Sequence, residues 1–350
     1  MSSAEILSSS IITIPRVSVL DADYLINQLK ERIRKGAPSS EGIALLFRNR
    51  SFATRRVFQE MYQTDALGNA DKFEKLAGQI QSEKWSVPAE QIRQIFEDEF
   101  LPNLAIVDVA DLYKDHERCI KVASRDKKDA PTGQLAALLA ASQLIVYSHD
   151  KSLRNADLAT HDLGALSVAL ADIYAANSLA YGLTTGETLL YGAGEQVVTR
   201  IADQLSIPRW AVACGLIAVV GVFVVLVAKP QARRKTVIEI LKAGGNFVLE
   251  QIEHGQNGKL VLQEAVIAQD KELDIIQIVA SALTIPSHGE GMLVQDIVEQ
   301  LRLQGFVGSG VTESNIRQIL RSYPCFVEIK RHRWHLGKIL SLSEERSLHQ

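Results

Sequence analysis

Short apolar runs alternate with amphipathic segments along the first part of the chain. Continuous apolar runs are typical of strands buried on both faces, and apolar residues about three to four positions apart are typical of helices that bury one face. Strands that alternate with helices predict an α/β fold, with a parallel sheet sandwiched by helices. Strands are expected at 16–20, 104–109 and 144–147, and helices at 24–33, 90–100, 113–123 and 133–141. A second strand–helix unit begins at Gly42–Phe47. Within it, 51–62 is predicted to be a strand or turn that leads into a helix ending at Glu60.

The C-terminal part has a different pattern. A polar–apolar helix is expected at 232–255, broken near Gly244-Gly245 and followed by a turn at 255–258. Three helices and two strands follow, at 274–283, 292–303, 312–321, 325–329 and 334–336. Gly305 is a helix stop signal, and Thr312 can cap the third helix.

One long apolar run, Trp210–Ala228, carries no charged residue. As a helix it would span roughly 28 Å, about the thickness of the hydrocarbon core of a bilayer. We therefore expect a transmembrane helix over 209–229. Basic residues from Lys229 to Lys235 favour a cytoplasmic position for the C-terminal side.

A second candidate span, Leu163–Leu183, contains one charged residue, Asp172. It is either a second membrane helix or an amphipathic helix that closes the first domain. A single span would leave residues 1–208 outside, whereas a hairpin of two spans would place both ends of the chain in the cytoplasm.

Composition excludes several classes of protein. The chain has 350 residues, of which 47% are hydrophobic, and a formal net charge of −3; these values exclude a disordered, collagen-like or disulfide-scaffold chain. Cys119, Cys214 and Cys325 lie far apart, so they form no zinc or redox motif and read as reduced thiols. Met1–Ser10 lacks the basic start and apolar core of a signal peptide.

These patterns divide the chain into five segments. They are 1–160, an α/β domain; 161–208, a helical linker with the possible membrane helix 163–183; 209–229, the transmembrane helix; 230–271, a helical linker; and 272–340, a small α+β domain.

Three aspartates stand where expected strands end or helices begin. Asp21 follows the strand at 16–20, Asp150 follows the strand at 144–147, and Asp129 precedes an Ala/Leu-rich helix. Functional groups gather at the carboxyl ends of parallel strands, so we expect an acidic pocket. Carboxylates suit Mg²⁺ or Mn²⁺, which activate water and stabilise charge on a phosphate. Taken alone, Asp21 and Asp129 also fit aspartates that cap helix N-termini.

Four segments in order resemble the PIN-domain nucleases over residues 15–155: SVLDADYLI, RRVFQEMY, SRDKKDAPTGQLAALLA and LIVYSHDKSL. The resemblance implies metal-dependent cleavage of RNA with Mg²⁺ or Mn²⁺. It also implies that Asp23 orients the site and that Ser148 is the small hydroxyl residue before the final acid. By the same resemblance, the catalytic and metal-binding acids are Asp21, Glu60, Asp129 and Asp150, with Asp126 as a supporting metal ligand. Taken alone, Glu60 reads as an exposed helix residue.

Three helices followed by two strands around a basic turn resemble a winged helix-turn-helix domain over residues 272–338. Residues 311–338 contain six Lys or Arg against two Asp or Glu. Basic side chains of the third helix and the wing would face phosphates: Arg317, Arg321, Lys330, Arg331 and Arg333. Winged helices also bind proteins, and this alternative stays open. His332 and His335 are expected at the surface.

Two functions follow from these features. The first is a membrane-anchored, metal-dependent endoribonuclease whose nuclease domain lies on the cytoplasmic side and whose winged helix recognises RNA, DNA or a protein partner. Lys151 and Arg154, beside Asp150, would hold the RNA backbone or form a solvated face. The alternative is a non-catalytic, membrane-tethered regulator that binds nucleic acid or protein. Homo-oligomerisation is compatible with both. A small-molecule enzyme is disfavoured because the chain has no glycine-rich phosphate loop, Gly-x-Ser-x-Gly elbow or His-Glu-x-x-His motif.

Overall fold

A computed structural model of the chain describes residues 12–34, 50–62, 71–82, 87–191, 234–267, 269–286, 290–306 and 310–340. The chain divides into two units. One unit combines Pro15–Leu163 with Ala265–Gln350, and the other combines Met1–Ile14 with Gly164–Glu264.

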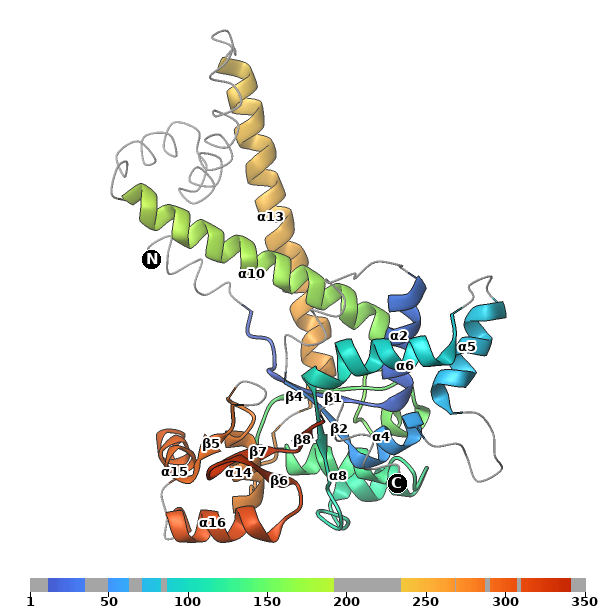
Figure 1. Cartoon of the computed structure of the whole chain (residues 1–350). Helices are drawn as coiled ribbons and strands as arrows, with labels where there is room; N and C mark the ends of the chain where they lie inside the picture. Colours follow the sequence, from blue (N-terminus) through green and yellow to red (C-terminus); the bar gives the residue numbers. More distant parts are fainter. Residues whose placement is uncertain are drawn as a thin grey trace. The chain divides into compact units, whose positions relative to one another are not determined.

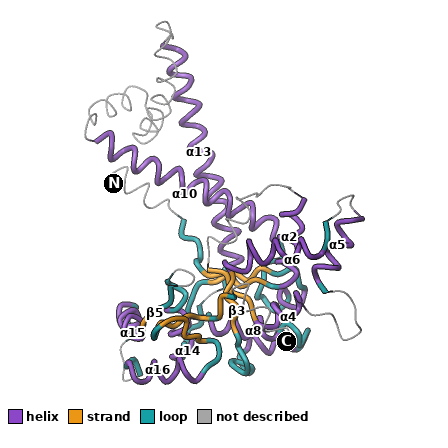
Figure 2. Tube along the Cα trace, in the orientation of Figure 1, coloured by secondary structure: helices purple, strands orange, loops and turns teal. Residues whose placement is uncertain are grey.

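The first of these units is built on a five-stranded sheet in the order β4-β1-β2-β3-β8 (Figures 1 and 2). The first four strands are parallel, and β8 is antiparallel to β3. The structure therefore has an α/β sheet with helices, but the sheet is mixed rather than parallel throughout as expected from the sequence. The strands are β1 (Val17–Leu20), β2 (Arg50–Thr54), β3 (Leu104–Val107), β4 (Leu144–Tyr147) and β8 (Lys338–Ile339). The segment 42–47 lies outside the described residues.

Three of the parallel strands are buried throughout because both faces of the sheet are covered. Every residue of β1, β3 and β4 is buried. Successive side chains of a strand point to opposite faces, and Val17, Val19 and Phe52 pack on one face in a core with residues of α7 and α8, such as Val122 and Leu135. Figure 1 shows α8 on one side of the sheet and α2 and α6 on the other.

The helices around the sheet largely match the sequence pattern. They are α2 (Ala22–Arg34), α4 (Arg55–Tyr62), α5 (Lys72–Ser82), α6 (Ala89–Ile95), α7 (Glu117–Ala123), α8 (Ala130–Leu138) and α9 (Lys151–Arg154). The helix expected at 90–100 is found as α6 followed by a π-helical turn, Phe96–Phe100, and a 3₁₀ turn, Leu101–Asn103. The helix expected at 113–123 begins late, because Tyr113 has a positive φ of 56° and His116 is the N-cap.

The C-terminal segment of this unit covers both edges of the parallel sheet. At one edge β8 pairs with β3, with Ile339 opposite Ala105. At the other edge the backbone N–H of Ile267 donates to Leu144 O at 2.9 Å, which forms an isolated antiparallel bridge with β4. An uncovered edge strand exposes unpaired backbone groups, so these pairings stabilise the sheet at both ends.

The same segment carries a second, three-stranded sheet in the order β5-β7-β6. Its elements are α14 (Ile275–Ala282), β5 (Met292–Leu293), α15 (Val294–Leu303), α16 (Glu313–Ser322), β6 (Phe326–Lys330) and β7 (Arg333–Leu336). Thr312 Oγ1 accepts from Asn315 N at 3.3 Å, so the predicted cap is confirmed. Arg331 and His332 both have positive φ, as a two-residue β-hairpin turn requires. His335 is 1% exposed, which corrects its expected surface position.

The second unit contains α10 (Leu163–Tyr191) and α13 (Arg234–Ala265). The break near Gly244-Gly245 and the turn at 255–258 were predicted wrongly, because α13 is continuous through both. A Cβ at Gly255 would lie 2.6 Å from Ala176 Cβ, and one at Gly258 would lie 2.8 Å from Ala169 O. These two glycines thus permit a close approach of α13 to α10.

The membrane-spanning fold and the membrane location expected from the sequence need correction. No helix in the described ranges has both the length and the apolar content needed to cross a bilayer. The candidate span Leu163–Leu183 belongs to α10, where Leu166 and Ile173 are buried and Val168 is 62% exposed. Asn177 of this helix exchanges two hydrogen bonds with the backbone of Ile12, at 2.8 and 2.9 Å. The run Trp210–Ala228 lies outside the described residues.

Gly337 provides a test of the β8 pairing. Its φ is +75°, and a Cβ there would lie 2.8 Å from Ile106 O. We expect Gly337→Ala to lower the free energy of unfolding by about 2–4 kcal/mol, through backbone strain and a clash with β3. Urea denaturation measures the loss. Gly305→Ala is the matched control, since Gly305 has φ +87° but free space around it; it should cost about 1 kcal/mol. Equal losses in the two variants would contradict this role of Gly337.

Candidate active site

Asp21 and Ser148 lie side by side where the strand order of the sheet reverses. The chain runs from β1 through β2 to β3 and then returns to place β4 on the other side of β1. In α/β sheets such a switch point leaves a crevice at the carboxyl ends of the strands. Leu20 of β1 pairs with Tyr147 of β4, so the next residues, Asp21 and Ser148, emerge together at this edge.

Asp21 is a buried carboxylate, with 7% of the residue exposed. Its Oδ2 accepts from Ser148 Oγ at 2.6 Å, and its Oδ1 accepts from the backbone N–H of Ala22 at 2.9 Å. Burial raises the pKa of Asp21 from 3.8 to about 7, assisted by the negative charges of Asp23 and Asp129 and opposed by the two hydrogen bonds.

Ser152 connects the other two aspartates of the site. Its Oγ donates to Asp129 Oδ2, and its backbone N–H donates to Asp150 Oδ1 at 2.6 Å. Asp150 is thus the N-cap of α9, so for this residue capping is observed. Asp129 precedes α8 but makes no capping hydrogen bond there. Instead, its side chain faces the acidic site.

Asp129 has an electrostatic environment similar to that of Asp21. Its pKa is raised by burial and by the charges of Asp150, Asp126 and Glu60, while the hydrogen bond from Ser152 opposes the rise. Asp129 is therefore close enough to Asp150, Asp126 and Glu60 to feel their charges, and Asp21 in turn feels the charge of Asp129. Asp126 Oδ1 itself accepts from the backbone N–H of Lys128 at 2.8 Å, which holds it in the turn before α8.

Glu60 has a different neighbour. It comes from α4 and forms an ion pair with Lys72, whose Nζ lies 2.9 Å from Glu60 Oε1. The same ammonium lies 3.3 Å from Asp23 Oδ1. By contrast, Asp21, Asp129 and Asp150 form no ion pair with any described residue. We call these three the inner aspartates, and Glu60 and Asp23 the outer acids.

The donor atoms of the inner aspartates fit a hard divalent cation. Three carboxylates provide the oxygen ligands that Mg²⁺ and Mn²⁺ prefer. The raised pKa of Asp21 reflects its burial first and the charges of Asp23 and Asp129 second, and a bound cation would favour the ionised carboxylate against both. As placed, their carboxylates bond to serines, and no three acidic, His or Cys side chains of the described residues surround a common point. Binding a metal would thus require the carboxylates to turn from the serine hydroxyls.

The basic candidates fall into two groups. Lys151 and Arg154 lie on α9, directly after Asp150; Lys151 is exposed, and Arg154 Nε donates to Asp150 O at 3.4 Å. In the C-terminal segment, Arg317 and Arg321 are exposed along α16. Of the hairpin candidates, Lys330 and Arg331 are exposed, and Arg333 Nη1 donates to Gly291 O at 3.0 Å.

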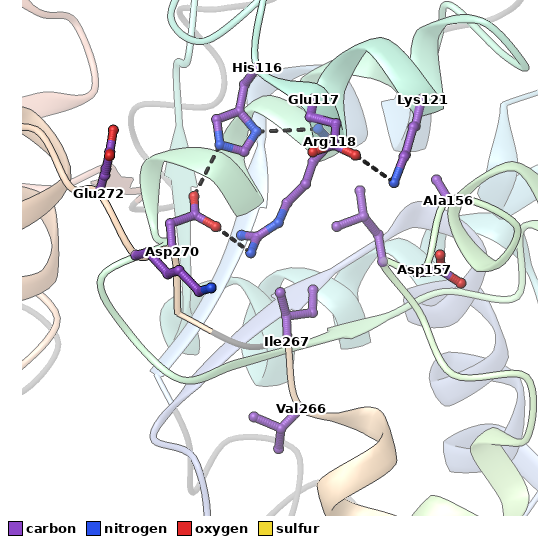
Figure 3. A pocket seen from close by; sticks show the side chains of 12 residues that line it. His116, Glu117, Arg118, Lys121, Ala156, Asp157, Val266, Ile267, Asp270 and Glu272 are labelled. Atoms are coloured by element: carbon purple, nitrogen blue, oxygen red, sulfur yellow. Dashed lines mark hydrogen bonds and ion pairs between the residues drawn. The ribbon is translucent and has the colours of Figure 1, made fainter.

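A cavity of about 520 Å³ lies elsewhere in this unit, lined by residues of α7 and of the segment after α13 (Figure 3). His116 and Arg118 converge there on Asp270: His116 Nε2 lies 3.0 Å from Asp270 Oδ2, and Arg118 Nη2 lies 2.6 Å from Oδ1. His116 Nδ1 accepts from the backbone N–H of Arg118, so the neutral ring carries its proton on Nε2. With both ring nitrogens engaged, His116 is not placed as a general base.

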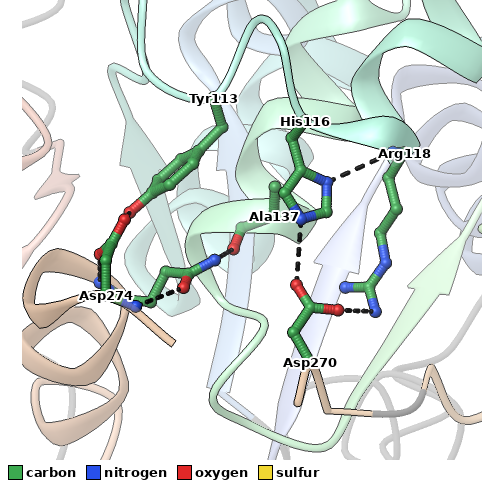
Figure 4. A network of polar contacts seen from close by, with 7 residues as sticks. Tyr113, His116, Arg118, Ala137, Asp270 and Asp274 are labelled. Atoms are coloured by element: carbon green, nitrogen blue, oxygen red, sulfur yellow. Dashed lines mark hydrogen bonds and ion pairs between the residues drawn. The ribbon is translucent and has the colours of Figure 1, made fainter. Parts of the chain in front are cut away.

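Figure 4 shows the polar contacts that continue from this cluster to α14. Tyr113 donates to Asp274 at 2.8 Å, and Gln277 Nε2 donates to Ala137 O of α8 at 2.9 Å. Asp274 also caps α14 by accepting from the backbone N–H groups of Ile276 and Gln277. These contacts attach α14 to α8 and thus to the sheet; we assign them a structural role.

Sequence reasoning missed Ser152 and Lys72. Ser152 lies two residues after Asp150, a spacing typical of a capped turn, and this signal could have identified it. Nothing in the sequence around Lys72 points to Glu60, because the two residues meet only through the packing of α5 against α4.

No protein-family model, curated protein or solved structure matches the chain.

The pKa of Asp21 leads to a pH-dependence prediction. In the unfolded chain this group ionises near 3.8, whereas in the folded chain it stays protonated up to about pH 7. The folded state therefore binds more protons between these values, and its stability falls as the pH rises through this window. Asp21→Asn removes the titration, so its stability relative to wild type should rise by about 2 kcal/mol from pH 5 to pH 7.

Urea unfolding in EDTA at several pH values measures this difference. The altered hydrogen bond to Ser148 adds a pH-independent offset, so the slope is the informative quantity. The control is Asp98→Asn, which changes an exposed aspartate outside the site. A stability difference for Asp21→Asn that does not change with pH would refute the account of this carboxyl.

Proposed function

We propose that the chain is a metal-dependent endoribonuclease that hydrolyses phosphodiester bonds of RNA. The observation that carries this proposal is the group of inner aspartates at the switch point of the sheet, without a cationic partner among the described residues. Perturbed carboxyl pKa values at such a crevice are typical of functional sites. The order of the four acidic segments, which resembles the PIN-domain nucleases, supports the choice of RNA.

Each residue has a role in this proposal. Asp21, Asp129 and Asp150 would hold the Mg²⁺ or Mn²⁺ ion, while Ser148 and Ser152 keep their carboxylates in place when no ion is bound. An ion held by these carboxylates would supply Lewis-acid chemistry, activating a water molecule and offsetting negative charge on the phosphate. Glu60 and Asp126 add negative charge around this centre.

Substrate contacts are assigned to residues beside the acids. Lys151 and Arg154 lie on α9, the short helix that Asp150 caps, so the chain places them close to one of the inner aspartates although neither forms an ion pair with it among the described residues. Lys and Arg side chains position a nucleic-acid backbone without reading its sequence. We therefore assign these two residues to binding the RNA phosphates on either side of the cleaved bond.

The test is cleavage of a labelled single-stranded RNA by the purified full chain with Mn²⁺. Asp129→Asn removes a charge from the ion's ligands and should lower the cleavage rate about 100-fold. EDTA should abolish cleavage by the wild type. Asp98→Asn, which changes an exposed aspartate outside the site, should cleave at the wild-type rate. Undiminished cleavage by Asp129→Asn would refute the proposal that the inner aspartates are the catalytic site.

A second candidate function is nucleic-acid binding without cleavage by the C-terminal segment. The observation that favours it is the exposed side of α16, where Arg317 and Arg321 line a shallow hollow together with Glu313, whose Oε2 lies 4.0 Å from Arg317 Nη2. The opposite side of the helix, with Ile316 and Leu320, is buried. A helix with a buried apolar face and an exposed basic face fits the geometry of a recognition helix.

This candidate predicts salt-dependent binding. Arg317→Gln and Arg321→Gln should each weaken binding to a DNA or RNA duplex and lower the slope of log K against log salt by about one. Fluorescence anisotropy at several KCl concentrations measures both quantities. Lys114→Gln, which removes an exposed lysine on the loop before α7, is the control and should change neither. Unchanged affinity and slope in both arginine variants would exclude α16 as the binding surface.

A further inference from the structure

Lys72 joins carboxylates from two different helices at the edge of the acidic site. Its ammonium nitrogen lies 2.9 Å from Glu60 Oε1 and 3.3 Å from Asp23 Oδ1. Glu60 belongs to α4, Asp23 to α2 and Lys72 to α5. One positive charge is thus shared by both outer acids.

The position of Lys72 is fixed by its neighbours in the chain. Asp71 is 5% exposed; its Oδ1 accepts from the backbone N–H of Glu74 at 2.8 Å, and its Oδ2 pairs with Arg93 at 2.6 Å. Phe73 is fully buried, with the ring of Tyr62 packed edge-on at 5.2 Å. Contacts on both sides therefore hold the start of α5, and with it the lysine, against α4.

The outer and inner acids differ in their charge balance. Glu60 and Asp23 have a lysine between them, whereas the inner aspartates form no ion pair with a described residue. A cation that enters the site gains the full attraction of the inner aspartates, but beside the outer acids it meets the repulsion of Lys72. The charge distribution thus favours cation binding at the inner aspartates over cation binding beside the outer acids.

We propose that Lys72 takes the place of a second divalent cation, so that the site holds one Mg²⁺ or Mn²⁺ ion, bound by Asp21, Asp129 and Asp150. Glu60 is then a partner of Lys72 rather than a metal ligand. This inference rests on the proposed function, because it requires that the inner aspartates bind a metal.

The test counts Mn²⁺ ions bound to the full chain, by electron paramagnetic resonance of the free ion during a titration. The wild type should bind one ion. Lys72→Met leaves Glu60 and Asp23 without a cation, so a second ion should bind, at least about tenfold more tightly than any second ion in the wild type. Lys72→Arg keeps the charge and should bind one ion.

Two further variants complete the experiment. Lys121→Met removes a lysine from an exposed ion pair with Glu117 on α7 and should bind one ion, as the wild type does. Glu60→Gln should still bind one ion, with an affinity lowered by less than about tenfold, because Glu60 contributes charge at a distance but is not a ligand. This variant keeps the test decisive if Lys72→Met does not fold, which circular dichroism reveals.

The outcomes separate this inference from the proposed function. Two ions in the wild type, one ion in folded Lys72→Met, or a tenfold weaker ion in Glu60→Gln would each overturn the role of Lys72 and leave the nuclease proposal standing. A wild type that binds no Mn²⁺ would instead refute the proposed function, and with it this inference.

Discussion

Uncompensated negative charge at the carboxyl edge of the parallel sheet is the constraint on which the rest of the site depends. The fold brings Asp21 to this edge because β1 and β4 are neighbours and end in register. Taking a carboxylate out of water is costly unless hydrogen bonds or cations replace the water. The chain provides hydrogen bonds, from Ser148 and Ser152, but no cation for the inner aspartates within the described residues.

The two serines connect the site to the ends of secondary-structure elements. Ser148 Oγ donates to Asp21 and accepts from the backbone N–H of Asp150 at 2.9 Å. Asp150 in turn caps α9 through Ser152. The short segment from Ser148 to Ser152 therefore caps α9 and also holds the carboxylates of Asp21 and Asp129, which come from other parts of the sequence. The capping alternative was considered for Asp21 and Asp129, whereas the aspartate that caps a helix through its side chain is Asp150.

The C-terminal segment is integrated with the sheet rather than attached to it at one point. It pairs with β3 through β8 and with β4 through Ile267. The side chain of Gln277 in α14 donates to the backbone O of Ala137, in the C-terminal part of α8 (Figure 4). Asp129 stands immediately before the N-terminus of the same helix. One helix thus connects the acidic site to the helices of the C-terminal segment within a single compact unit.

The sequence predicted those features that depend on local pattern. The strands β1, β3 and β4 were found because strands buried on both faces are apolar throughout. The pairing of β8 was not predictable, because Lys338 and Ile339 have no pattern of their own and pair with β3 only through tertiary structure.

Long-range contacts explain the other positions where the structure differs from the sequence-based prediction. Gly255 and Gly258 were read as a turn, since glycine is common in turns, whereas their lack of a Cβ serves the approach of α13 to α10. For the site, the aspartates carried a signal because Asp21 and Asp150 follow strands and Asp129 precedes a helix. The pairing of Lys72 with Glu60 carried none, because helices packed together in three dimensions create it.

The most direct test of the central claim is a crystal structure grown with Mn²⁺ and measured at a wavelength where manganese scatters anomalously. The account predicts an anomalous difference peak within coordination distance of the carboxylates of Asp21, Asp129 and Asp150, with the hydroxyls of Ser148 and Ser152 released from them. A map with no peak at these carboxylates, from crystals in which the chain is ordered and Mn²⁺ is saturating, would contradict it.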